Sequence, residues 1–148
     1  MPTFRDLQAQ ANDPVNKAKA LEAALQILRF HAVFNTEYHL VEDKIVEAED
    51  AIDAIDANPN GVDQAMRADL SEFVLEQQGR LDLLDAKLRA FEASDLNIRP
   101  PTKEMVAQVK KETALVAALQ VKGGALSAII KGLTEIAQIA DKSGKSHP

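Results

Sequence analysis

Apolar residues recur every three or four positions between residues 27 and 55, and this spacing constrains the fold most. It lies between the turn signals Asn12-Asp13-Pro14 and Asn58-Pro59-Asn60-Gly61, and its members are Ile27, Phe30, Phe34, Tyr38, Val41, Ile45, Ala48, Ile52 and Ile55. Such steps place the residues on one face of an α-helix that meets partner helices. Two consecutive steps of four, from Phe30 to Tyr38, indicate a stutter in the seam. The sequence therefore predicts a helix over residues 14–57, and leaves open whether a bend at Asn35-Thr36 splits it in two.

Two further segments show helical periodicity. The second follows Asp63 and runs to about Ser94, where a loop ending in two prolines stops it, because proline lacks the amide donor that a helix needs. Thr102 is the expected N-cap of the third. We expect that segment to form one helix of nearly forty residues, roughly 55 Å long at about 1.5 Å per residue. The apolar positions are Met66, Leu70, Phe73, Leu81, Leu84, Leu88 and Phe91 in the second segment, and Val106, Val109, Val116, Leu119, Leu126, Ile130, Leu133 and Ala137 in the third.

No run alternates apolar and polar residues with β-branched enrichment, so the sequence predicts no strand. The expected class is all-α: an elongated antiparallel bundle of three long helices, or four if the first one splits. A chain of 148 residues is the size of one domain, which we take as 1–148. Residues 1–12 are expected to be an N-terminal lead-in, and residues 141–148 a mobile tail.

Composition excludes several classes of protein. With no cysteine, the chain cannot be a disulfide scaffold, a cysteine-ligated zinc protein or a thiol nucleophile. The net charge of −6 and an aromatic content of 4% disfavour direct nucleic-acid binding. The first residues lack the features of a secretory signal, so we expect a cytoplasmic protein. The charge-poor stretch 113–133 is interrupted by lysines and glycines, which favours a buried helix over a membrane span.

Negative charge is concentrated in the second half of the first predicted helix. Between Glu37 and Asp56 eight carboxylates are opposed by a single base, Lys44. With the apolar seam buried, the carboxylates from Glu42 onward point outward and form a surface that we call the acidic ridge: Glu42, Asp43, Glu47, Glu49, Asp50, Asp53 and Asp56. The last three lie near a helix C-terminus, where carboxylates oppose the macrodipole at a cost of about 0.3–1 kcal/mol each. A solvated face is the simplest interpretation, but acids placed against the dipole fit a surface that meets a basic partner.

Four small residues, Gly123, Gly124, Ala128 and Gly132, are the second feature of the sequence. Small residues four apart share a helix face and allow another backbone to approach closely. Each glycine costs a helix roughly 1 kcal/mol relative to alanine. The four residues therefore indicate close helix packing or a kink, and the alternative is a peptide-binding groove or a hinge.

Catalytic and metal-binding constellations are missing from the sequence. His31 and His39 are eight residues apart, so they diverge around a helix by about 80° and cannot form an i, i+4 metal pair. His39 and Glu42 share a face, but a di-iron bundle needs further ligands from other helices. The tail motif Gly144-Lys145-Ser146 lacks the first glycine of a phosphate-binding loop. We expect no enzyme activity, no metal and no cofactor.

The sequence favours a non-enzymatic module that binds another protein with a basic surface through Glu42, Glu47, Glu49, Asp50, Asp53 and Asp56. Immunity proteins, adaptors and inhibitors that mimic nucleic acid offer an analogy of class, not of motif. A self-assembling homo-oligomer joined through the heptad seams is the alternative. A third hypothesis is a membrane-active protein that uses residues 113–133 as a hairpin arm.

Overall fold

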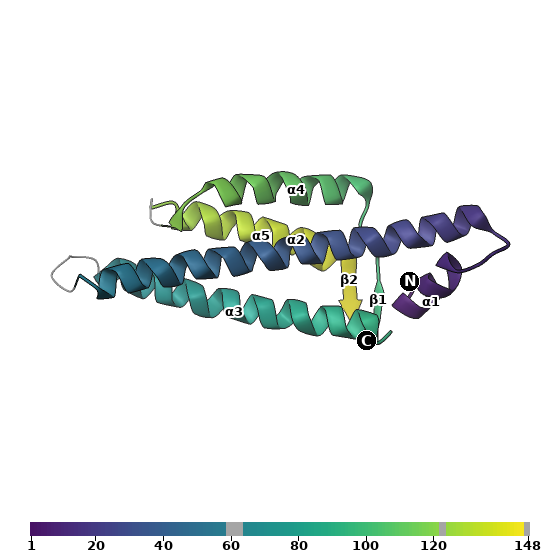
Figure 1. Ribbon diagram of the computed structural model, residues 1–148, viewed down its shortest axis with the longest axis horizontal. Coiled ribbons are helices and arrows are strands. Elements are labelled where there is room, and N and C mark those ends of the chain that lie inside the picture. The colour runs from purple at the N-terminus through teal and green to yellow at the C-terminus, as the bar shows by residue number, and fades with distance from the viewer. Residues whose placement is uncertain (59–63, 122–123, 147–148) are drawn as a thin grey trace.

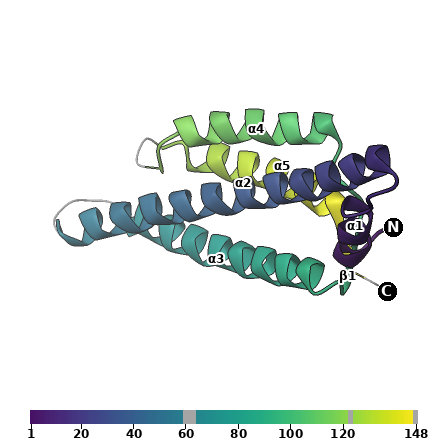
Figure 2. The same cartoon turned by 45° about the vertical axis from the view of Figure 1, so that its right-hand side comes forward.

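The structure, a computed structural model, describes residues 1–58, 64–121 and 124–146. Figure 1 shows an elongated molecule in which the longest helix lies between a single antiparallel helix on one side and a helical hairpin on the other. Figure 2 shows the same arrangement from a second direction. In these residues the elements are α1 (Phe4–Ala11), α2 (Lys17–Asp56), α3 (Gln64–Glu92), β1 (Leu96–Ile98), α4 (Lys103–Ala118), α5 (Leu126–Ser143) and β2 (Gly144–Ser146). The predicted all-α bundle is confirmed.

The first predicted segment is one uninterrupted helix of 40 residues, α2. It begins at Lys17, three residues later than predicted, because the Asn16 side chain accepts a hydrogen bond from the Lys19 amide and caps the helix there. No break occurs at Asn35-Thr36. α2 packs against α1, α3, α4 and α5, so it is the central element of the core.

The third segment is two helices, and the prediction of one helix about forty residues long is wrong. α4 ends at Ala118 and α5 begins at Leu126, with Gly124 in the left-handed region at φ 77° between them. The glycine pair in the sequence weakens helix formation there. Folding back then lets both halves bury their apolar faces against α2, which one straight helix could not do over its whole length.

The two ends of the chain are also more ordered than predicted. Residues 4–11 of the expected lead-in form α1, which starts with a reciprocal capping box between Thr3 and Asp6. At the other end, Ser143 still belongs to α5, and β2 pairs with β1 in antiparallel register with Lys145 opposite Asn97. The prediction of no strand is therefore wrong for these residues, because strands of three residues are too short to show alternation in the sequence. Residues 147–148 of the predicted tail lie outside the described residues.

Gly132 allows α4 and α5 to pack closely. It is buried, and a Cβ atom added there would overlap with Cγ2 of Val116 on α4. Val116 is itself buried and branched at Cβ, so it has little freedom to move aside. Gly79 in α3 is the contrasting case, because a Cβ atom there would meet nothing within 4 Å.

We therefore expect alanine to have opposite effects at these two glycines. Overpacking should cost Gly132→Ala about 1–3 kcal/mol, partly offset by about 1 kcal/mol of helix propensity, whereas Gly79→Ala should gain about 0.5–1 kcal/mol. Urea unfolding followed by circular dichroism measures both free energies of unfolding. Adding Val116→Ala should weaken the Gly132→Ala penalty, and equal effects at the two glycines would contradict the close packing of α4 on α5.

Candidate functional site

The acidic ridge lies on the outer surface of the C-terminal half of α2. Val41, Ala48 and Ala51 on the opposite side of the helix are buried in the core. The carboxylates Asp43, Glu49, Asp50, Asp53 and Asp56 are exposed, and those of Glu42 and Glu47 are partly exposed. The ridge therefore faces solvent, as expected from the periodicity of the sequence.

An exposed apolar side chain, Val46, lies in the middle of the ridge. Its exposed fraction is 57%. Residues three, four and seven positions away lie on the same side of a helix. By this spacing the carboxylates around Val46 are those of Glu42, Asp43, Glu49, Asp50 and Asp53. The ridge thus offers an apolar contact point within a ring of negative charge.

Lys44, the single base in this stretch, does not neutralise the outer face of the ridge. Its side chain is buried with 1% exposure and points into the bundle. The Nζ atom donates to the Leu119 carbonyl at 2.6 Å, at the end of α4, and to Glu47 at 2.7 Å. Lys44 therefore satisfies an orphan carbonyl at a helix C-terminus, and it draws Glu47 toward the α4 side of α2.

Asp56 also has an intramolecular partner. The Arg67 guanidinium on α3 donates to both carboxylate oxygens of Asp56, at 2.6 and 3.1 Å. This hydrogen bonding lowers the pKa of Asp56 below its ordinary value. The pair ties the end of α2 to the start of α3. Among the described residues, Asp43, Glu49, Asp50 and Asp53 remain without a cation, while Glu42 lies 3.3 Å from His39.

The four small residues of the sequence analysis do not share one helix face. Gly132 is buried on α5 against α4, and Ala128 on the same helix is exposed. Gly124 belongs to the connection between the two helices, and Gly123 lies outside the described residues. The close helix packing that the sequence suggested is present at Gly132, where the Val116 side chain of α4 occupies the space that a Cβ atom would take.

A cluster of charges, buried at Glu37 and exposed at Asp141, joins α2, α3 and α5, and we call it the arginine clamp. Arg80 on α3 donates to both oxygens of Glu37 on α2, at 2.6 and 2.8 Å, and to Asp141 on α5 at 3.1 Å. Lys87 donates to the same Asp141 at 2.5 Å. The exposed fraction of Glu37 is 1%. The clamp is thus a structural tie between three helices rather than an open site.

The pKa values in the clamp follow from burial and pairing. Burial raises the pKa of Glu37 above its ordinary value, although the hydrogen bonds from Arg80 oppose that rise. For Asp141, burial is outweighed by Lys87 and Arg80, so its pKa lies below its ordinary value. Burial also acts to lower the pKa of Arg80, but pairing with Glu37 raises it overall, which keeps the guanidinium charged.

The clamp was not predicted from the sequence, although a signal for it was present. Glu37 lies three residues after Phe34 and four before Val41, so it occupies a position of the apolar seam. A charged residue at such a position predicts a buried partner of opposite charge. Which of the basic residues provides that partner depends on the packing of α3 against α2.

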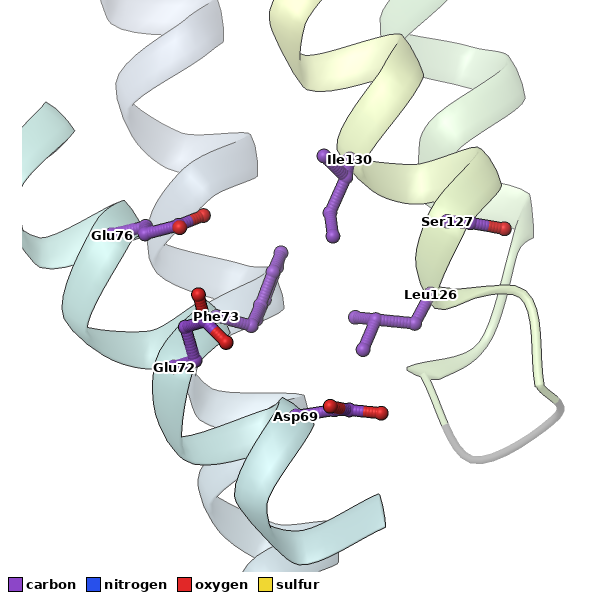
Figure 3. Close-up of a pocket in the computed structure, with 7 residues that line it drawn as sticks. All are labelled: Asp69, Glu72, Phe73, Glu76, Leu126, Ser127 and Ile130. Atoms are coloured by element: carbon purple, nitrogen blue, oxygen red, sulfur yellow. The ribbon is translucent and has the colours of Figure 1, made fainter. Parts of the chain in front are cut away.

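A groove of about 340 Å³ lies between α3 and α5 (Figure 3). Both helices pack against α2, and the arginine clamp joins them toward the C-terminal end of α5. Toward the N-terminal end of α5 they diverge and leave the groove open. Its residues are Asp69, Glu72, Phe73 and Glu76 on α3 and Leu126, Ser127 and Ile130 on α5.

No cluster of potential metal ligands forms in the described residues. Residues 1–58, 64–121 and 124–146 contain no group of three or more histidine, cysteine, aspartate or glutamate side chains that could hold a metal ion. His31 lies against the ring of Phe91, with the ring centroids 5.9 Å apart, and His39 is beside Glu42 on the surface. In the same residues no helix is both long and apolar enough to cross a membrane.

Comparisons with known proteins do not assign this arrangement to a family. No family model matches the chain, and neither the curated proteins nor the solved structures contain a match.

Proposed function

We propose that the chain is a non-enzymatic protein-binding module that covers a basic surface of a partner protein with the acidic ridge. The observation that carries this proposal is the position of Val46, exposed at the centre of five carboxylates. Interfaces commonly combine an apolar anchor with charges around it that select the partner. In this proposal Val46 supplies the apolar anchor, and the five carboxylates supply the charges that select a basic surface.

The charge balance of the ridge supports a basic partner. Lys44 is turned inward and Arg67 is bound to Asp56, so neither neutralises the outer face around Val46. A concentrated negative field of this kind accelerates association with a positively charged surface and repels acidic competitors. The contact surface that we propose consists of Val46 with Glu42, Asp43, Glu49, Asp50 and Asp53.

An inhibitor or immunity-type protein is the class that we favour within this proposal, with an adaptor as the alternative. Masking a basic active site requires a rigid acidic surface, and α2 is held on its other side by α3, α4 and α5. A rigid surface loses little conformational entropy on binding. A cysteine-free chain also suits the cytoplasmic location that we propose for it.

The decisive experiment is capture of the partner with the tagged protein from its host, at low and high salt. We expect a stoichiometric basic protein that is released as the salt concentration rises, because salt screens exposed charges. The variant Asp50→Lys with Asp53→Lys should lose that protein, while the helical circular dichroism signal stays unchanged. Affinity for the purified partner should fall by roughly a hundredfold or more, since like charges at an interface cost several kcal/mol.

A matched control is Glu92→Lys with Glu135→Lys, which changes the net charge by the same amount at exposed positions of α3 and α5. It should retain the partner. Equal loss in both variants would mean that only the net charge matters, and unchanged affinity in the ridge variant would remove the ridge from the interaction.

A further inference from the structure

The groove between α3 and α5 is lined by carboxylates from α3 and by apolar side chains from α5, which offer those carboxylates neither a cation nor a hydrogen bond. Figure 3 shows the carboxylates of Asp69 and Glu76 reaching from α3 toward α5, while Leu126 and Ile130 extend into the same gap from the other side. Closing the gap would press carboxylates against apolar side chains and remove their water, which is costly without a cation. The walls therefore stay apart, and an occupant that carries both apolar groups and cations would fit them.

The exposed face of α4 carries both apolar groups and cations. Its exposed residues include three lysines, Lys103, Lys110 and Lys111, and four alanines, Ala107, Ala114, Ala117 and Ala118. Leu115 on this face has an exposed fraction of 56%. Glu104, in the first turn, is the one carboxylate among the exposed side chains of α4. The small alanines allow a second helix to approach closely between the lysines.

The spacing of the charges on the two surfaces matches. Three carboxylates of α3, those of Asp69, Glu72 and Glu76, form what we call the rim of the groove. The first and the last of them are seven residues apart, and Lys103 and Lys110 on α4 have the same separation. Seven residues rise about 10 Å along a helix, so both pairs can form at once when the helices are nearly aligned. None of these charged side chains has an ion-pair partner in the described part of the chain.

We propose that the α3/α5 groove is a self-association site that receives the lysine- and alanine-rich face of α4 from a second copy of this chain. In this contact Leu115 or an alanine of α4 covers Phe73, Leu126 and Ile130, and the lysines pair with Asp69, Glu72 and Glu76. The contact joins two different surfaces, so it is heterologous and links copies head to tail. It does not rest on the proposed function, because the acidic ridge of α2 takes no part in it.

Sedimentation velocity of the full chain from micromolar to millimolar concentration tests this contact. The mass should rise with concentration at low salt and fall toward that of the monomer at high salt. Two variants change only exposed side chains: a rim variant with Asp69, Glu72 and Glu76 changed to Lys, and an α4 variant with Lys103, Lys110 and Lys111 changed to Glu. Each alone should weaken association by roughly tenfold or more. An equimolar mixture of the two should associate again, because each reversed surface then meets its complement.

Other outcomes overturn the proposal. The proposal is wrong if the wild-type chain stays monomeric at millimolar concentration. It is also wrong if the rim variant associates as strongly as the wild type. Failure of the mixture to associate would mean that the charges do not meet each other. The ridge variant Asp50→Lys with Asp53→Lys should associate like wild type, and loss of association there would place the contact on α2 instead. If the chain stays monomeric at millimolar concentration and its groove nevertheless binds a lysine-rich amphipathic peptide, the site belongs to a different basic partner.

Discussion

Arg80→Met is expected to lower the free energy of unfolding by about 3–5 kcal/mol, because it leaves the buried Glu37 carboxylate without its cation. The Arg80 guanidinium is bound to Glu37 through two hydrogen bonds, and no other basic side chain hydrogen-bonds to that carboxylate among the described residues. Urea unfolding at neutral pH measures the loss. It should shrink as the pH falls, because burial raises the pKa of Glu37 and loss of the opposing Arg80 hydrogen bonds raises it further, so the variant's carboxyl takes up a proton and is no longer an unpaired buried charge.

Two further variants show whether the missing charge causes this loss. The double variant Glu37→Met with Arg80→Met removes both charges and should recover most of the stability, since apolar residues of similar volume can replace a buried ion pair. Arg67→Met removes the exposed partner of Asp56 and should have a much smaller effect. If the double variant is as unstable as Arg80→Met, the loss comes from packing and not from the unpaired carboxylate.

Phe91→Ala is the other change with a large expected effect, about 3–5 kcal/mol, because Phe91 joins three helices near one end of the bundle. Its ring centroid lies 4.0 Å from that of Phe30 on α2 and 4.9 Å from that of Phe4 on α1. The side chain is fully buried. Removing the ring should leave a cavity and release α1, so amide hydrogen exchange in residues 4–11 should accelerate together with the fall in stability.

The matched variants for this position are Phe91→Leu and Phe4→Ala. Leucine keeps most of the volume and should cost considerably less than alanine. Phe4 is only partly buried, so Phe4→Ala should accelerate exchange in α1 with a smaller loss of global stability. Unchanged exchange in α1 after Phe91→Ala would show that other contacts hold this helix.

The seam of α2 shows how far residue type can mislead a sequence analysis. Seven of its buried residues, Phe30, Phe34, Glu37, Val41, Lys44, Ala48 and Ala51, alternate steps of four and three without interruption, and Ala23, Val33, Leu40 and Ile45 are buried beside them. A pattern built from apolar residues alone assigns Tyr38 to the seam in place of Glu37, and Ile45 in place of Lys44. The choice of Tyr38 produces the two consecutive steps of four that indicated a stutter. The buried seam of α2 therefore includes two charged residues: Glu37 pairs with Arg80 on α3, and Lys44 donates to the Leu119 carbonyl at the end of α4.

The acidic ridge could be located from the sequence, but not the part of it that we propose as the contact surface. Periodicity alone places its carboxylates on the side of α2 opposite Val41 and Ala48. The inward turn of Lys44, the pairing of Asp56 with Arg67 and the exposure of Val46 depend on helices that are distant in the sequence. The groove between α3 and α5 could not be predicted, because its walls come from two segments whose relative position has no local signal.

The sequence by itself determined the helical class, the central amphipathic helix and its uneven charge, because each follows from spacing along one segment. Only the tertiary structure decided that the third segment folds back into α4 and α5, that residues 4–11 form a helix against Phe91, and that Glu37 and Lys44 are buried. These features depend on contacts between residues far apart in the chain, where the gain from burying an apolar face or pairing a charge outweighs local preference.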